Sequence, residues 1–251
     1  SLIQWLIFQN TGDSAFLAQE AKPFLRVLAP ILGGILAGLI LLLHSHLSGK
    51  KKPTNVLEVV ALGDGRIGMR STLISAWSSL ISIGSGASIG REGAITQLTA
   101  AFASKWGQTH EWQPYRLRLM VACGAAAGLA AAYNAPIAGA LFAALVLVGN
   151  FSMNLFAPLV MSSVVATMVS RFWFGIDPWY VLPESMNFDH ATNFTSMLWF
   201  LILGIISGAS GAFFLKSIQK METISAKSPW SLWSKLGLAG LVVGIVALIF
   251  P

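Results

Sequence analysis

The sequence predicts an all-α, polytopic membrane protein. Of its 251 residues, 55% are apolar and only 10% are charged, whereas soluble domains carry about 25% charged residues. Mean hydropathy is +0.70. The basic residues behind the net charge of +6 lie mainly in short segments between apolar runs. That distribution suits membrane topology and argues against a nucleic-acid partner.

Five apolar runs have the character of membrane segments. They are residues 27–43, 71–89, 155–174, 194–215 and 236–250. The first is long enough, with its flanks, to cross a hydrocarbon core of about 30 Å. The second is rich in serine, which suits a helix packed among other helices.

Three shorter apolar pieces lie between these runs, at residues 94–104, 119–133 and 136–149. Asn134-Ala135-Pro136 predicts a helix break between the last two, because proline cannot continue a helix. Short, interrupted segments are typical of transporter binding sites, since irregular backbone is tolerated in a membrane only where it lines a cavity.

Four glycine pairs have the GxxxG spacing that lets helix backbones approach closely. They are Gly34/Gly38, Gly124/Gly128, Gly204/Gly208 and Gly240/Gly244. Apolar helices rich in glycine also produce such pairs by chance. We therefore take them as a prediction of close helix packing and not of dimerisation.

The charged residues predict the orientation. Three acids and no Lys or Arg occur in residues 175–193, whereas two predicted loops are rich in lysine: one carries Lys50, Lys51 and Lys52, and the other carries Lys216, Lys220, Lys227 and Lys235. The positive-inside rule places both lysine loops in the cytoplasm and the acidic segment outside. One predicted span, 194–215, separates the acidic segment from the second lysine loop, so the assignment is self-consistent.

A single carboxylate, Glu92, lies in a glycine-rich break, Gly84-Ser85-Gly86-Ala87-Ser88-Ile89-Gly90-Arg91-Glu92-Gly93-Ala94. An acid at membrane depth is costly and tends to face a cavity or a pathway. The glycines let the backbone turn and expose N–H groups, and a helix that begins beyond them adds positive dipole. These are the parts of an anion site. The alternative is that Glu92 only caps a helix and pairs with Arg91.

Two motifs resemble the CLC family of chloride channels and chloride/proton exchangers. Gly90-Arg91-Glu92-Gly93-Ala94 is similar to the GREGP signature of that family. The stretch from Cys123 to Gly139, CGAAAGLAAAYNAPIAG, resembles the family segment GAAAGLAAAFNAPLAG. Ala94 in place of proline, together with Lys52-Pro53-Thr54-Asn55 and Ile83-Gly84-Ser85-Gly86-Ala87, makes the chain most similar to the bacterial ClcB-type branch.

The resemblance implies an inverted-repeat helical fold in the bacterial inner membrane, acting as a homodimer with one anion pore per subunit and no cofactor. Residues 1–175 would form the first repeat, and residues 194–251 would open the second. Family subunits have about twice as many helices as this chain is expected to contain. The element that closes the inner end of the pore is therefore not expected within it.

By resemblance, Glu92 is the gating glutamate of a voltage- or pH-gated chloride channel. Its ionised carboxylate would occupy an outer anion site built around Gly90, Arg91, Gly93 and Ala94. Protonation would release the carboxylate and admit chloride.

Two departures from the family pattern leave alternatives open. The exchangers carry a second, inward-facing glutamate, but Leu145 and Val146 stand in that region, so passive conduction is favoured over an antiporter with a non-standard proton route. The family's glycine–serine element is replaced by Lys50-Lys51-Lys52-Pro53-Thr54-Asn55. Thr54 could offer a hydroxyl to the anion, while Thr54 or Asn55 could cap a short helix over 56–62. Chloride is therefore expected, with nitrate or fluoride as alternatives.

The remaining polar residues predict little chemistry. Lys50, Lys51 and Lys52 would attract anions to the inner mouth or serve only as topology markers. His44 and His46 are two apart and do not share a helical face, so no metal site is expected. An enzyme would need paired polar groups that the chain does not offer. A membrane assembly subunit stays an alternative, although it would not need a glycine-flanked acid at membrane depth.

Overall fold

The computed structural model describes residues 23–47, 55–87, 89–149, 151–175 and 194–249, and all of the regular structure in them is helical. The elements are α3 (Pro23–Leu47), α4 (Val56–Ala61), α5 (Met69–Gly84), α6 (Glu92–Thr109), α7 (Pro114–Tyr133), α8 (Pro136–Phe142), a π-helical segment η1 (Ala143–Val148), α9 (Met153–Phe174), α10 (Phe194–Lys227) and α11 (Leu232–Ile249). The all-α prediction is confirmed for these residues. Among the described residues, four helices are long and apolar enough to cross a bilayer: α3, α9, α10 and α11.

The predicted boundaries of three segments were wrong. Helix α5 ends at Gly84 instead of residue 89, because Gly86 adopts a left-handed φ of 105° that ends the helix. Helices α6 and α7 are longer than residues 94–104 and 119–133, at 18 and 20 residues. The charged residues at their ends, such as Lys105 and Arg116, extend the helices because lysine and arginine are good helix formers.

Helix α10 forms a compact unit of its own, apart from the unit that holds the other helices. It has 34 residues, which at 1.5 Å per residue span about 51 Å. The predicted lysine loop is therefore wrong in part, because Lys216, Lys220 and Lys227 lie on this helix and Lys235 lies on α11. Lys, Gln, Met and Glu between residues 216 and 222 favour a helix that continues beyond the apolar run.

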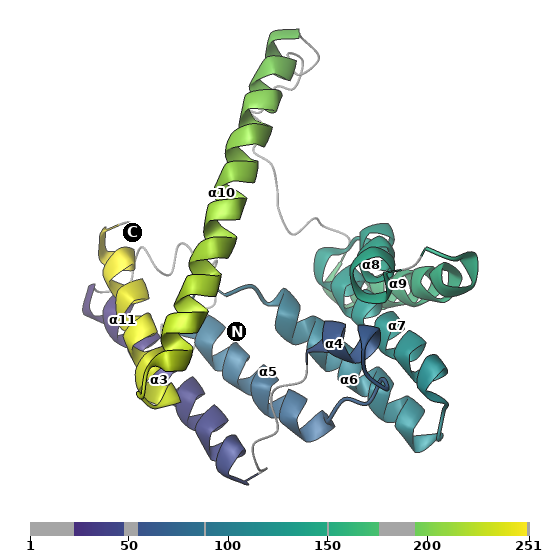
Figure 1. Cartoon of the computed structure of the whole chain (residues 1–251), viewed down its shortest axis with the longest axis horizontal. Helices are drawn as coiled ribbons and strands as arrows, with labels where there is room; N and C mark the ends of the chain where they lie inside the picture. The colour runs from purple at the N-terminus through teal and green to yellow at the C-terminus, as the bar shows by residue number, and fades with distance from the viewer. Residues whose placement is uncertain (1–22, 48–54, 88, 150, 176–193, 250–251) are drawn as a thin grey trace. The chain divides into compact units, whose positions relative to one another are not determined.

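Helices α3 and α11 pack side by side (Figure 1) through their glycine pairs. A Cβ atom at Gly34 or Gly38 would overlap the backbone of α11, and one at Gly240 or Gly244 would overlap the backbone of α3. Gly124 and Gly128 pack in the same way against α6. The packing prediction is confirmed for these three pairs. Gly204 and Gly208 lie on α10, in the other compact unit, and the packing predicted for this pair stays a prediction.

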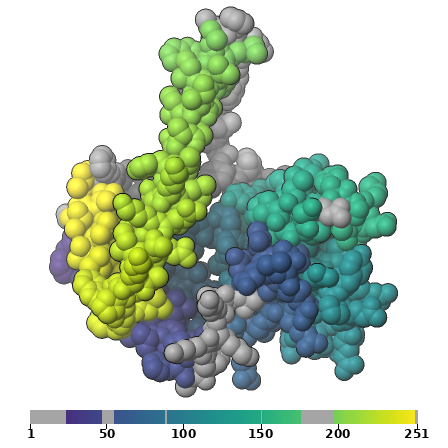
Figure 2. Space-filling view, in the orientation of Figure 1, coloured from purple at the N-terminus to yellow at the C-terminus, as the bar shows by residue number. Residues whose placement is uncertain are grey.

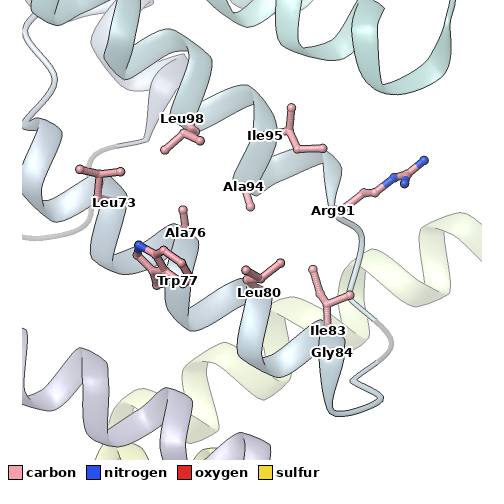
Figure 3. A pocket seen from close by; sticks show the side chains of 10 residues that line it. All are labelled: Leu73, Ala76, Trp77, Leu80, Ile83, Gly84, Arg91, Ala94, Ile95 and Leu98. Carbon is pink, nitrogen blue, oxygen red and sulfur yellow. The ribbon is translucent and has the colours of Figure 1, made fainter. Parts of the chain in front are cut away.

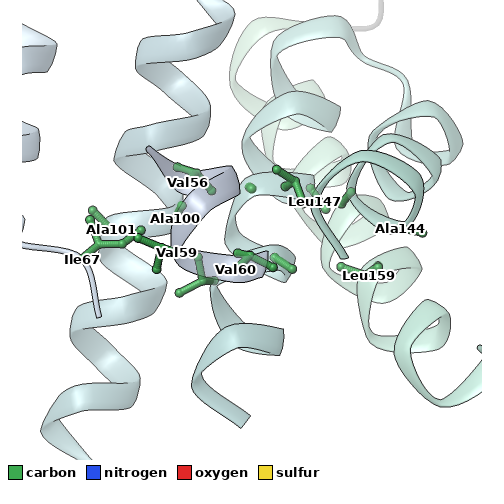
Figure 4. Close-up of a cluster of buried hydrophobic side chains, with 14 of the residues drawn as sticks. Val56, Val59, Val60, Ile67, Ala100, Ala101, Ala144, Leu147 and Leu159 are labelled. Atoms are coloured by element: carbon green, nitrogen blue, oxygen red, sulfur yellow. The ribbon is translucent and has the colours of Figure 1, made fainter. Parts of the chain in front are cut away.

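The short helix α4 sits in the main core. Val56, Val59 and Val60 belong to a buried cluster that also contains Ala100 and Ala101 of α6 and continues into α7, α8, η1 and α9 (Figure 4). Figure 2 shows α4, in blue, lying against the teal helices, and it contacts both α7 and η1. Most of the buried residues in this cluster are alanine or valine, so the helices approach closely and hold α4 in a fixed place.

A buried polar network holds the loop between α4 and α5 on α6. The hydroxyl of Ser104, which is fully buried, donates to the carbonyl of Gly65 at 2.6 Å and accepts from the N–H of Ile67 at 2.8 Å. The side-chain amide of Gln108 donates to the same hydroxyl at 2.8 Å. This network satisfies the loop backbone inside the core, where an unpaired group would be costly.

Candidate functional site

Glu92 is the first residue of α6. The chain leaves α5 through the turn at Gly86, and Arg91 occupies the N-cap position without a side-chain capping bond. The carboxylate of Glu92 curls back onto its own backbone N–H. The glycine-rich break therefore ends at a helix start, as the sequence predicts, and the carboxylate lies at the positive end of the helix dipole.

The carboxylate also has a tertiary partner on α7. The hydroxyl of Tyr133 donates to Glu92 Oε1 at 2.7 Å. This bond joins residues 41 positions apart, at the last residue of α7 and the first residue of α6. Glu92 therefore has a partner besides its own helix and Arg91, and Tyr133 was not predicted from the sequence.

The predicted helix break fixes the position of Tyr133. Asn134 adopts a left-handed conformation at φ 55° and ψ 31°, and α8 begins at Pro136. From α9, Arg171 Nε donates to Asn134 Oδ1 at 2.6 Å, and the hydroxyl of Ser170 donates to the carbonyl of Ala131 at 3.3 Å. The sequence showed only that Arg171 is the one charge in its apolar run. In the structure it joins α9 to the residue that follows α7.

Gly90 makes room for the carboxylate. A Cβ atom at Gly90 would overlap Glu92 Oε2, whereas a Cβ atom at Gly93 would meet nothing within 4 Å. Gly90, Gly93 and Ala94 all line the same cavity as Glu92. The structure therefore brings these three predicted site residues together around the carboxylate.

Arg91 lies elsewhere. It lines a separate groove of about 510 Å³ between α5 and α6, together with Trp77, Leu80 and Ile95. Figure 3 shows the apolar side chains of the two helices facing one another, while the guanidinium group points away from them. The structure does not place the Arg91 side chain in the cavity that holds Glu92.

The cavity beside Glu92 has a volume of about 880 Å³. Its lining comes from α4, α5, α6, α7, α8 and η1 and consists of Asn55, Val56, Leu57, Ser79, Ile89, Gly90, Glu92, Gly93, Ala94, Thr96, Gln97, Leu129, Tyr133, Phe142, Val146 and Leu147. Both α4 and α6 begin at this cavity. The lining is mostly apolar with a few convergent polar groups, as is usual for a binding site.

The predicted capping of α4 is confirmed for Asn55, whose Oδ1 accepts from the N–H of Leu57 at 3.1 Å. Thr54 and the three lysines at 50, 51 and 52 lie outside the described residues. Val146, one of the two positions where the exchangers of the resembled family carry an acid, lines the cavity. In the described lining, Glu92 is the only acid.

Five basic residues of α5, α6, α7 and the loop before α5 lie at the ends remote from Glu92, whereas Arg91 and Arg171 lie near it. Successive helices joined by short connections alternate in direction, so the start of α5, the end of α6 and the start of α7 share one side (Figure 1). That side carries Arg66, Arg70, Lys105, Arg116 and Arg118. Helix α9 ends beside Asn134, close to the Glu92 end of α6.

Comparison with known proteins gives a consistent result. The family model described as voltage gated chloride channel matches residues 33–251. The voltage-gated ClC-type chloride channel ClcB of Yersinia pseudotuberculosis is 35% identical over 219 residues, which cover 86% of this chain and 52% of that protein. The chain spans between 52 and 59% of the length of the curated relatives it matches.

Two solved structures share the fold. A slow cyanobacterial Cl⁻/H⁺ antiporter matches 100% of this chain and 59% of its own, with a TM-score of 0.74 and 22% identity. A CLC-type fluoride/proton antiporter matches 96% of this chain and 67% of its own, with a TM-score of 0.62 and 22% identity. At this level of identity the likeness establishes the fold, and the predicted all-α, CLC-type helical fold is confirmed.

Proposed function

This chain belongs to the voltage-gated chloride channel (CLC) family of integral membrane proteins, and on that premise we propose that it forms part of an anion pathway gated by Glu92. The observation that carries the proposal is the position of the carboxylate. It lies at the start of α6, in a cavity of about 880 Å³ built from six elements. A movable anion held at a helix N-terminus competes directly with a transported anion for the same donors.

In the proposed cycle, ionised Glu92 occupies the outer anion site, and Gly90, Gly93 and Ala94 form its wall. Protonation removes the attraction between the carboxylate and the backbone N–H groups. The side chain then leaves and an anion takes its place. Gly90 allows both positions because it offers no Cβ atom to obstruct the carboxylate.

We propose passive conduction, gated by pH or voltage, ahead of proton-coupled exchange. Exchange needs a second proton acceptor on the inner side of the pathway, and the cavity-lining residue at the expected position is Val146. Both similar solved structures are antiporters by name, so an antiporter with a different proton route is the second candidate. We further propose chloride as the anion, a homodimer as the assembly, and residues 1–175 and 194–251 as parts of two inverted repeats.

The test is Glu92→Gln in the full-length protein, purified and reconstituted in liposomes. Chloride efflux should lose its dependence on pH, because glutamine is neutral at every pH and cannot hold the site as an anion. Glu111→Gln is the matched control, since Glu111 lies just beyond the opposite end of α6. If chloride efflux through the Glu92→Gln variant keeps its dependence on pH, Glu92 is not the gate.

The same vesicles decide between the two transport modes. Chloride movement without proton movement supports a channel, whereas proton movement in fixed proportion to chloride supports an antiporter. Replacing chloride with nitrate or fluoride in the same assay tests the anion.

A further inference from the structure

We propose that the hydroxyl of Tyr133 is a latch on the Glu92 gate, which sets how readily the carboxylate leaves its site. The proposal rests on the gating function proposed for Glu92 and assigns a positioning residue to it. Two side chains from different helices meet here at the edge of one cavity. The hydroxyl stabilises only the arrangement in which the carboxylate is in place.

The contact has the geometry of a strong hydrogen bond. Tyr133 Oη lies 2.7 Å from Glu92 Oε1, which is within the range typical of a hydroxyl that donates to an ionised carboxylate. A tyrosine hydroxyl donates well to a carboxylate and is a poorer partner for a protonated acid that no longer carries charge. The bond therefore favours the ionised, retained carboxylate over the released one.

Few other groups act on the carboxylate. The elements packed around it contribute Asn55 from α4, Ser79 from α5, Phe142 from α8 and Val146 from η1, and none of these carries a charge. On α6 itself, Thr96 and Gln97 are polar but do not titrate.

Arg91 adds a charge interaction with Glu92, while its side chain lines the groove between α5 and α6. Within the described lining of the cavity, Tyr133 and Glu92 are the two side chains that can titrate. Tyr133 is thus the principal side-chain partner of the gate.

The hydroxyl is held in a defined place. Tyr133 is the last residue of α7, and the next residue, Asn134, is fixed by the bond from Arg171 on α9. A latch anchored on a second helix keeps its position when the Glu92 side chain moves. The related family segment has phenylalanine at this position, so the chain adds a hydroxyl to an aromatic ring that the motif already contains.

The test is Tyr133→Phe, which removes the hydroxyl and keeps the ring. Loss of one hydrogen bond should shift the equilibrium between retained and released carboxylate about three- to tenfold toward release. Chloride efflux should therefore begin at a pH about 0.5–1 unit higher than in the unmodified protein, with the maximal efflux at low pH unchanged. Tyr115→Phe is the matched control, because Tyr115 lies at the opposite end of α7, away from Glu92.

The outcomes separate the latch from the gate. If Glu92→Gln abolishes the pH response and Tyr133→Phe leaves the midpoint unchanged, the latch is wrong and the gate stands. If Glu92→Gln itself leaves the pH response unchanged, the gate is wrong and the latch falls with it. A drop in efflux at every pH with a constant midpoint would make the hydroxyl an anion ligand and overturn the latch. A higher pH midpoint of efflux in Tyr133→Phe, with the midpoint of Tyr115→Phe unchanged, supports the latch.

Discussion

The two ends of α6 carry polar side chains for opposite purposes. Toward its C-terminal end, Ser104 is fully buried and bonded to Gly65, Ile67 and Gln108. At its N-terminal end, Glu92 faces a cavity of about 880 Å³ and has one tertiary hydrogen bond, from Tyr133. The first end is fixed because breaking its network would leave buried backbone groups unpaired. The second is suited to motion because the carboxylate has one tertiary hydrogen bond and faces open space.

The comparison predicts that substitutions at the fixed end change stability and that substitutions at the movable end change gating. A useful measurement therefore records both quantities for every variant. Unfolding in detergent reports the first, and the pH midpoint of chloride efflux reports the second.

The largest effect is expected for Ser104→Ala. The substitution leaves the carbonyl of Gly65 and the N–H of Ile67 without the partner they have now, which should lower the free energy of unfolding by about 2–3 kcal/mol. The pH midpoint should not move. Ser71→Ala is the control, since its hydroxyl bonds only the exposed start of its own helix. If Ser104→Ala is as stable as the unmodified protein but has altered gating, the two ends of α6 do not serve different purposes.

The next effect is expected for Gly90→Ala. The added methyl group would overlap Glu92 Oε2, which is the far end of a flexible side chain, so the carboxylate moves while the backbone stays. The displaced carboxylate loses its bond to Tyr133, at a cost to the closed state of about 1 kcal/mol. Efflux at neutral pH should rise with little change in unfolding. A large loss of stability would show instead that Gly90 serves the fold.

The sequence was sufficient to predict the helical fold, the break at Asn134, a helix start after the glycine-rich break and the close packing of three glycine pairs. Each of these depends on local chemistry: apolar run length, proline, or the small size of glycine. Tyr133 and Arg171 were not found, because their partners lie 41 and 37 residues away. Only the packing of α6, α7 and α9 brings these pairs together.

The extent of the helices was also predicted poorly at charged residues. Lys216 and Lys220 marked the end of an apolar run, but α10 continues to Lys227. Hydropathy detects where a segment can leave the membrane, whereas helix propensity decides where the helix ends. A helix end is easier to predict where a proline follows, as at Asn134-Ala135-Pro136 after α7.

The smallest effect is expected for Asn134→Gly, which tests whether the bond from Arg171 to Asn134 affects gating through Tyr133. Glycine adopts the left-handed conformation of this residue freely, so the break between α7 and α8 should survive. The acceptor for Arg171 is lost, which weakens the anchor of Tyr133 by about 0.5–1 kcal/mol. The midpoint of efflux should move in the same direction as in Tyr133→Phe, by less than about 0.5 unit.

Glu111→Gly is the matched control for that variant, because Glu111 also has a left-handed φ, of 53°, but lies beyond the other end of α6. In the double variant Tyr133→Phe with Asn134→Gly, the effect of Asn134→Gly should vanish, since there is no hydroxyl left to position. Independent, additive shifts would mean that Asn134 acts on the gate by another route. If Asn134→Gly has no further effect in the double variant, Arg171, Asn134 and Tyr133 form one line of contacts that ends at Glu92.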